Sequence, residues 1–265
     1  MIRQRIGGKV RNFSILVFCF LGSFVWAETE KALEETVLVP KTNSFRVQVE
    51  NAALWQTRNA FRLPGNAGTE VDLADFKSGP FYAPRFLAEW NINEWHGLRL
   101  LIAPLTFGVQ YTPGQDLSIR GQTFQKGTPV TTSFKFNSYR LTYRYFFESS
   151  SPWKFRLGVT AKIRDANIST TDGVKTAQDP NLGFVPLVHF GVKRELNDNW
   201  FADLDIDALG APQGRAEDVA LRLGYVEQPW EFALGYRFLE GGADNDRVYT
   251  FAFFHYAFFS AAYLF

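Results

Sequence analysis

Apolar and polar side chains alternate along much of the chain. In the segment 153–165, every odd-numbered residue from Trp153 to Ile163 is apolar, and the even-numbered residues between them are charged, polar or glycine. A period of two places the two sets on opposite faces of a β-strand. The pattern recurs in segments 200–209 and 230–238, so we predict strands with one apolar and one polar face.

Ten segments carry a strand pattern, and helical periodicity is almost absent. Most have the roughly 9–11 residues that a tilted strand needs to cross a bilayer, and no apolar stretch after residue 27 approaches the ~18 residues of a transmembrane helix. The segments are 44–54, 81–92, 98–111, 131–147, 153–165, 182–195, 200–209, 217–227, 230–240 and 248–265.

The predicted connections alternate in length. Short connections are expected at 93–97, 148–152, 196–199 and 228–229, and long ones at 55–80, 112–130, 166–181, 210–216 and 241–247. Outer-membrane β-barrels have short periplasmic turns and longer outside loops. We therefore predict an all-β fold, an antiparallel up-and-down transmembrane β-barrel of about ten strands, with both chain ends in the periplasm.

The composition supports strands that face lipid. Aromatic residues make up 17% of the chain, with 27 Phe, 10 Tyr and 7 Trp, and transmembrane barrels place such residues in girdles at both membrane surfaces. The alternative is a soluble β-sandwich or lipocalin-like barrel. That fold would turn the apolar faces inward and would have to hold many large aromatic side chains there.

The first residues have the three parts of a secretory signal. Four basic residues precede an apolar run at 13–25, and Val25 and Ala27 supply the small residues of a cleavage site after Ala27. The apolar run is too short for a membrane anchor. We predict a signal peptide at 1–27, a flexible periplasmic tail at 28–43 and the barrel at 44–265.

Several chemistries find no support in the sequence. The single cysteine, Cys19, lies in the leader and follows Phe18, which a lipidation signal does not allow. Removing the leader's four bases would leave 24 basic and 27 acidic side chains, a near balance that does not indicate a nucleic-acid partner. No cofactor is expected. The run 244–246 lacks the spacing of a calcium loop, and no metal site is predicted. Residues 35–39 look like the box of energised outer-membrane receptors, but the chain is too short for such a receptor.

The chain ends on Tyr263-Leu264-Phe265, at the end of an alternating aromatic segment. This ending resembles the terminal signature of Gram-negative outer-membrane β-barrel proteins. The resemblance implies that the barrel-insertion machinery reads Tyr263 and Phe265 and that the partners include outer-membrane lipid and lipopolysaccharide. The stretches 136–144, 211–216 and 239–246 also resemble a group of small exported barrel proteins, a resemblance that implies no activity.

The polar strand faces should line the barrel lumen. Antiparallel pairing through the turn at 197–199 places Lys193 beside Asp203 and His189 beside Asp207, and an earlier hairpin is expected to place Arg144 opposite Arg156. The predicted lumen-lining charge network consists of Arg140, Arg144, Arg156, His189, Lys193, Asp203, Asp205, Asp207, Asp218, Arg222 and Arg237.

Three functions fit a charged lumen. A narrow porin-like channel for small polar solutes would use the charges for selection. A structural or loop-binding barrel would use the charges as a plug. Side chains can fill the lumen of an eight-stranded barrel, and a ten-stranded barrel is only slightly wider. A hydrolase could use the His189–Asp207 pair, although we expect no enzyme and assign no catalytic residue. His255 is a lipid-facing histidine, and the sequence places no serine beside it.

Overall fold

The computed structural model describes residues 43–147, 152–211 and 214–265. The predicted signal peptide and nearly all of the predicted periplasmic tail lie outside these ranges.

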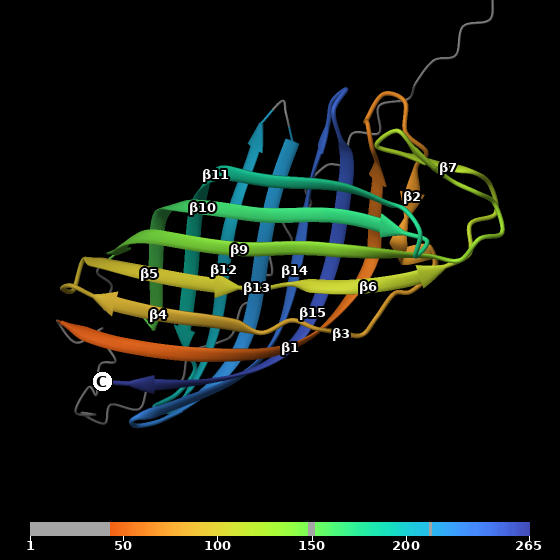
Figure 1. Cartoon of the computed structure of the whole chain (residues 1–265). Helices are drawn as coiled ribbons and strands as arrows, with labels where there is room; N and C mark the ends of the chain where they lie inside the picture. The colour runs from red at the N-terminus through yellow and green to blue at the C-terminus, as the bar shows by residue number, and fades with distance from the viewer. Residues whose placement is uncertain (1–42, 148–151, 212–213) are drawn as a thin grey trace, which may run out of the picture. The chain divides into compact units, whose positions relative to one another are not determined.

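Ten antiparallel strands form a closed barrel (Figure 1). Each strand pairs with its neighbour in the chain, and β15 pairs with β1 to close the ring. The predicted fold class and strand number are confirmed. The strands are β1 (Ser44–Arg62), β4 (Arg85–Asn91), β5 (His96–Ala103), β9 (Val130–Phe147), β10 (Trp153–Thr171), β11 (Thr176–Glu195), β12 (Trp200–Ala211), β13 (Gly214–Glu227), β14 (Trp230–Asp244) and β15 (Tyr249–Leu264).

Five short strands and one helical turn lie near one end of the barrel. β2 (Val71–Asp72) and β3 (Phe81–Tyr82) pair with β1, and β6 (Thr106–Tyr111) pairs with β9. β7 (Leu117–Ile119) and β8 (Gln122–Phe124) form a hairpin, and η1 (Leu73–Asp75) is a single 3-10 turn. Within the described ranges, no helix is long and apolar enough to span a membrane.

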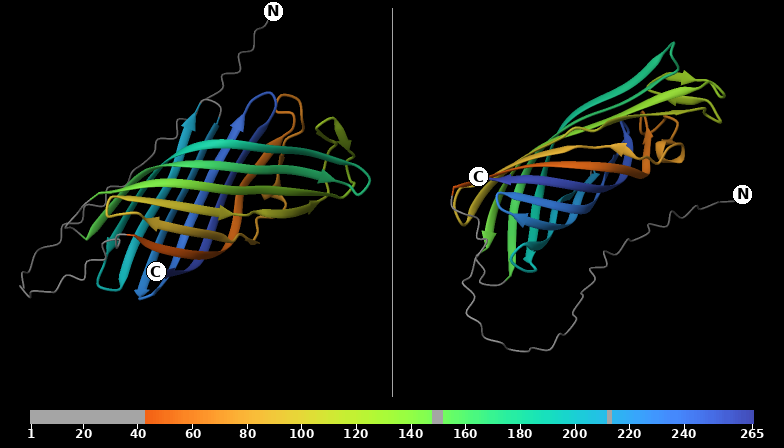
Figure 2. Two further views of the ribbon diagram at one scale, coloured as in Figure 1. Left: turned by 60° about the vertical axis from the view of Figure 1, so that its left-hand side comes forward. Right: turned by 90° about the horizontal axis from the view of Figure 1, so that it is seen from below.

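The two rims of the barrel are distinguishable. The first strand begins and the last strand ends at the same rim, which we call the proximal rim. There the backbone amide of Phe265 donates to the carbonyl of Phe45 at 2.8 Å. The opposite, distal rim carries the loops and short strands. The outer parts of β9, β10 and β11 continue beyond β12 as a lobe with β6 (Figure 2), because β11 pairs with β12 only from Val188 onward.

A band of apolar side chains surrounds the barrel. On β10 the outward residues are apolar from Trp153 to Ile163 and polar from Asp165 onward. Ten steps along a tilted strand span about 26 Å, close to the ~25 Å apolar band of a transmembrane barrel. Ile163 pairs with Tyr139, and Tyr139 pairs with Ile102, so the distal edge of the band follows the register around the wall.

Three of the five predicted long loops are much shorter than expected. β10 and β11 fill most of the segment 166–181 and leave only a turn at 172–175, and β14 and β15 leave only 245–248. β12 and β13 cover the segment 210–216 except for residues 212–213, which lie outside the described ranges. On β9 and β10 the outward side chains beyond the lipid band are polar, so the apolar-polar alternation that reveals a strand ends before the strand does.

Candidate functional site

Charged side chains fill the proximal half of the lumen, and we call this set the proximal plug. Among the described residues, eight arginines form ion pairs with seven carboxylates, and the pairs link strands on all sides of the barrel. The members are Arg46, Glu50, Arg85, Glu89, Arg99, Arg140, Arg144, Arg156, Asp203, Asp205, Asp207, Asp218, Arg222, Glu231 and Arg237.

The three aspartates of β12 form the ladder predicted from the alternating pattern. Asp203 binds Arg156 at 2.8 Å and Arg222 at 2.6 Å. Asp205 accepts two hydrogen bonds from one nitrogen of Arg99, at 2.9 and 2.8 Å. The ladder therefore spans the lumen and joins β12 to strands on both sides of it.

Asp218 of β13 is a second centre of the proximal plug. Its carboxylate contacts Arg85 at 3.1 Å, Arg140 at 2.7 Å and Arg237 at 2.6 Å. Arg237 also donates to Glu50 at 2.9 Å. One carboxylate thus joins three guanidinium groups from three strands, so its removal would leave several buried charges without their main partner.

His189 belongs to the same network and is fully buried. Its Nδ1 lies 3.0 Å from Asp207, as the predicted register requires, and Arg99 and Arg140 contact the other oxygen of that carboxylate at 3.3 and 2.9 Å. Thr160 also donates to Asp207 at 3.1 Å. The imidazole ring of His189 is therefore enclosed by the side chains around it.

The predicted pairing of β9 with β10 is wrong by two residues. Arg144 lies opposite Gly158, and Arg156 lies opposite Phe146. The ladder starts at the pair Phe147–Phe155, and residues 148–151 of the predicted turn lie outside the described ranges. A shift of two residues keeps every side chain on its face, and both arginines still point into the lumen.

The register predicted for β11 and β12 is confirmed. Lys193 lies directly opposite Asp203, and the ammonium group of Lys193 lies 3.9 Å from the centre of the Phe201 ring.

A glycine on β11 makes room for Arg156. A Cβ atom at Gly191 would lie 2.4 Å from the guanidinium group of Arg156. Glycine at that position therefore lets Arg156 cross β11 toward the aspartate ladder.

Several plug residues were missed, although their signal was present in the sequence. Arg46 and Glu50 alternate with the apolar residues of β1, and Arg85 and Glu89 do so on β4. Arg99 does the same on β5. These residues lie on the first three strands of the barrel. All of them except Glu89 have a partner on β12–β14, so only the closed ring brings the two groups together.

Apolar side chains fill the distal half of the lumen, and we call this set the distal plug. Phe107, Phe134 and Phe254 pack with ring centroids 5.4 to 6.2 Å apart. Around them lie further buried residues from the wall and the loops, namely Leu54, Phe61, Leu63, Val71, Leu73, Leu105, Leu117, Ile119, Phe124 and Tyr256.

Backbone hydrogen bonds tie the distal loops to one another across the mouth. The amide of Arg120 donates to the carbonyl of Leu63 at 2.7 Å, and the amide of Thr69 donates to the carbonyl of Ser118 at 2.8 Å. The segment after β1 is therefore held against the hairpin β7–β8, and the two together place apolar side chains in the mouth. The predicted long loop 55–80 is partly strand, and its remainder forms this cover.

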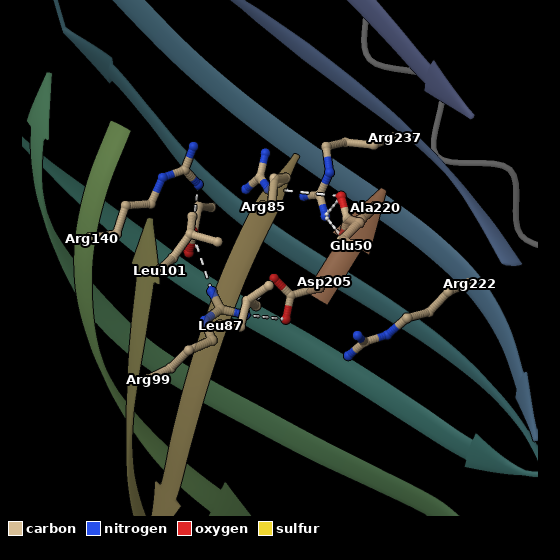
Figure 3. Close-up of a pocket in the computed structure, with 11 residues that line it drawn as sticks. Glu50, Arg85, Leu87, Arg99, Leu101, Arg140, Asp205, Ala220, Arg222 and Arg237 are labelled. Carbon is tan, nitrogen blue, oxygen red and sulfur yellow. Dashed lines mark hydrogen bonds and ion pairs between the residues drawn. The ribbon is translucent and has the colours of Figure 1, made fainter. Parts of the chain in front are cut away.

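The space left between the plug residues is small. Figure 3 shows the guanidinium groups of Arg85, Arg99, Arg140 and Arg237 gathered near Glu50 and Asp205 around one cavity. This cavity and a second one beside Pro84 and Pro104 each have a volume of about 20 Å³. That volume holds about one water molecule.

A polar group also lies on the outer wall, at the distal edge of the apolar band. His255 Nδ1 lies 2.5 Å from the hydroxyl of Tyr236, and His255 Nε2 lies 2.9 Å from the hydroxyl of Thr57, at a bulge in β1. The sequence offered no serine for this histidine, and the structure supplies a threonine. When Tyr236 donates to Nδ1, the proton of His255 is on Nε2, and the ring cannot then accept the proton of Thr57.

The remaining predicted features lie at the rims. Tyr263 and Phe265 pack edge to face at the proximal rim, with ring centroids 4.8 Å apart. At the distal rim, the side chain of Asn245 accepts from the amides of Arg247 and Val248 and closes a turn. The described part of the chain contains no group of acidic, histidine and cysteine side chains arranged to hold a metal ion.

Comparison with known proteins identifies the fold. No protein-family model matches the chain, and a search of curated proteins finds no match. The outer membrane protease OmpT of Escherichia coli aligns over 87% of this chain and 99% of its own, with a TM-score of 0.51 and 12% identity. The attachment invasion locus protein Ail of Yersinia pestis aligns over 84% of this chain and 99% of its own, with a TM-score of 0.39 and 11% identity. The chain therefore has the β-barrel fold of Gram-negative outer-membrane proteins.

Proposed function

We propose that this outer-membrane-type barrel is closed at rest and serves as a rigid anchor for its distal lobe, which carries the contacts with other molecules. Of the three functions that fit the sequence, this is the structural or loop-binding one. The observation that carries the proposal is the pair of plugs in series. A solute crossing the lumen would have to pass both the ion-paired layer and the apolar layer.

The proximal plug opposes passage because its charges are already paired. In a selective channel, charged rings hold a passing ion in place of its hydration shell and release it again. Here the eight arginines hold seven carboxylates at buried positions, so a passing ion would have to break pairs that fix the wall. Such pairs are costly to break singly, since a lone buried charge remains.

The distal plug opposes passage by excluding water. Phe61, Phe124 and Phe254 are all fully buried, and an apolar constriction of this kind dewets and blocks ions. The lobe that continues beyond the lipid band has polar outward faces, which suit contacts outside the membrane. We assign the proximal rim to the periplasm, because its turns are short and because the first strand begins and the last strand ends there.

Solute uptake by liposomes tests the proposal. Liposomes containing the purified protein are placed in isotonic arabinose, and swelling is followed by light scattering against protein-free liposomes and against liposomes containing a general porin. We expect the protein-free rate. Swelling at a rate comparable to the porin would overturn the proposal and favour the narrow channel.

A variant that weakens only one plug sharpens this test. Asp205→Ala removes a carboxylate of the proximal plug and leaves the distal plug unchanged. Because the plugs lie in series, the variant should swell no faster than the parent. A large gain in this variant would show that the apolar layer does not block solutes.

A further inference from the structure

The proximal plug carries more positive than negative charge. Its eight arginines face seven carboxylates, and within the described ranges no other carboxylate forms an ion pair with any of these arginines. Arginine stays protonated in proteins, so one positive charge of the plug has no negative counterpart. A buried charge that is not balanced strongly destabilises a fold.

The lysines of the lumen do not reduce this excess. Lys162 is buried, and Lys193 lies opposite Asp203, so both add positive charge to the interior. A buried lysine can lose its proton, whereas an arginine cannot. The charge that needs a counterion is therefore at least the single excess charge of the arginines.

The excess charge is concentrated around one small cavity. Five of the eight plug arginines line the cavity of Figure 3, but only three of the seven carboxylates do so. The arginines extend from β4, β5, β9, β13 and β14, and the carboxylates are Glu50, Asp205 and Asp207. Five positive and three negative charges leave the lining with an excess of two positive charges.

Some guanidinium nitrogens of the lining residues lack an acceptor. Among the described residues, the buried Nε atoms of Arg85, Arg99 and Arg237 have no hydrogen-bond partner. The Nε atom of Arg85 lies 3.8 Å from Glu50, which is too far for a hydrogen bond. A buried N–H group without an acceptor is unfavourable, so the donors of this cavity call for an additional acceptor.

The carboxylates at the cavity are already held by arginines. Asp205 accepts two hydrogen bonds from Arg99, and Glu50 accepts one from Arg237 at 2.9 Å. Asp207 contacts two arginines. Their negative charges are offset within these pairs, and the remaining donors set the preference of the cavity for an anion.

The size of the cavity limits which anion fits. Its volume of about 20 Å³ has room for one water-sized species. A single monatomic anion fits this space, whereas sulfate, phosphate and organic anions are too large. Chloride is the common anion that meets both the charge and the size.

We propose that the cavity lined by Arg85, Arg99 and Arg237 binds one chloride ion, which balances the excess charge of the proximal plug. The ion accepts from the arginines that the carboxylates leave without a full set of partners. Because the lumen is closed, the ion enters as the barrel folds and stays bound. This site goes beyond the closed-barrel function, because it concerns a bound ion and not the passage of solutes.

The chloride dependence of folding tests the site. The protein is refolded in detergent micelles and unfolded with urea at a series of sodium chloride concentrations, with sodium gluconate keeping the ionic strength constant. One bound chloride should raise the equilibrium constant of folding about tenfold for each tenfold rise in chloride above the dissociation constant. An equilibrium constant that does not respond to chloride would overturn the proposal.

Arg85→Gln removes the excess charge without leaving a carboxylate alone. Seven arginines then face seven carboxylates, and the two carboxylates that Arg85 contacts keep Arg140 and Arg237. Folding of this variant should lose its dependence on chloride. The matched control is Arg215→Gln, which removes an exposed arginine at the distal rim and should keep the dependence of the parent. An equal dependence in Arg85→Gln and the parent would show that chloride acts elsewhere and would refute the site.

Bromide covers the case in which Arg85→Gln does not fold. The parent protein is folded and crystallised in sodium bromide, and anomalous scattering locates the bound bromide ions. One peak is expected in the cavity among Arg85, Arg99 and Arg237. A cavity that holds a water molecule and no bromide would refute the site, and so would peaks confined to the protein surface, which mark an adventitious ion only.

Discussion

Asp218→Ala is the sharpest perturbation of the proximal plug. The carboxylate contacts Arg85, Arg140 and Arg237 at 3.1, 2.7 and 2.6 Å, and Asp218 is 4% exposed. Removing one partner of a buried ion pair costs about 3–5 kcal/mol, because the other charge stays buried. Glu50 still neutralises part of Arg237, so we expect the lower half of that range.

Urea unfolding of the refolded barrel in detergent micelles measures this loss, and the heat-dependent shift in gel mobility reports whether the barrel has folded. A loss of about 3 kcal/mol should lower the unfolding midpoint by roughly 1 M or more. Glu240→Ala is the matched control, because it removes the partner of Arg215 from an exposed pair and should cost at most about 1 kcal/mol. If Asp218→Ala costs no more than Glu240→Ala, the proximal plug does not stabilise the barrel as we describe.

Three further changes test other parts of the account. Phe254→Ala removes a fully buried ring from the distal plug and should cost about 3–5 kcal/mol in the same urea assay; a cost below about 1 kcal/mol would mean that the plug is loosely packed. Leu157→Arg places a charge in the middle of the apolar band and should cost about 2–4 kcal/mol in lipid, while Ser169→Arg, beyond the band on the same face, should cost almost nothing; equal costs would misplace the membrane. His189→Ala should lower stability and leave peptide and lipid hydrolysis at the parent's level, and a loss of hydrolysis would restore an enzymatic role to the His189–Asp207 pair.

The strands were predictable because each one carries its own signal. Inside the lipid band one face must be apolar and the other polar, so alternation alone located all ten strands and three of the four short proximal turns; most of the fourth, at 148–152, lies outside the described ranges. Beyond the band the constraint disappears, and residues such as Asp165 and Asn167 are polar on the outward face as well. The distal ends of β10 and β11 were therefore read as loop.

The charged site was predictable in part. Asp203, Asp205 and Asp207 stand out on one strand, and the tight turn before β12 fixes the pairing of His189 with Asp207. Pairings across the lumen, such as Arg99 with Asp205, depend on the diameter and tilt of the closed ring. No local pattern in the sequence contains that information.

The distal plug was not predicted. Leu63 and Leu73 enter the lumen because the segment after β1 folds back onto the hairpin β7–β8, which is a tertiary contact.

A resting lumen closed by two plugs in series conducts no ions, and single-channel recording in planar bilayers measures this property. We predict that the purified, folded protein adds no discrete current steps to the bilayer in 1 M KCl at either polarity. Discrete, ion-selective steps from the parent protein, with a selectivity that changes in Arg144→Ala, would contradict the claim and show that the lumen conducts.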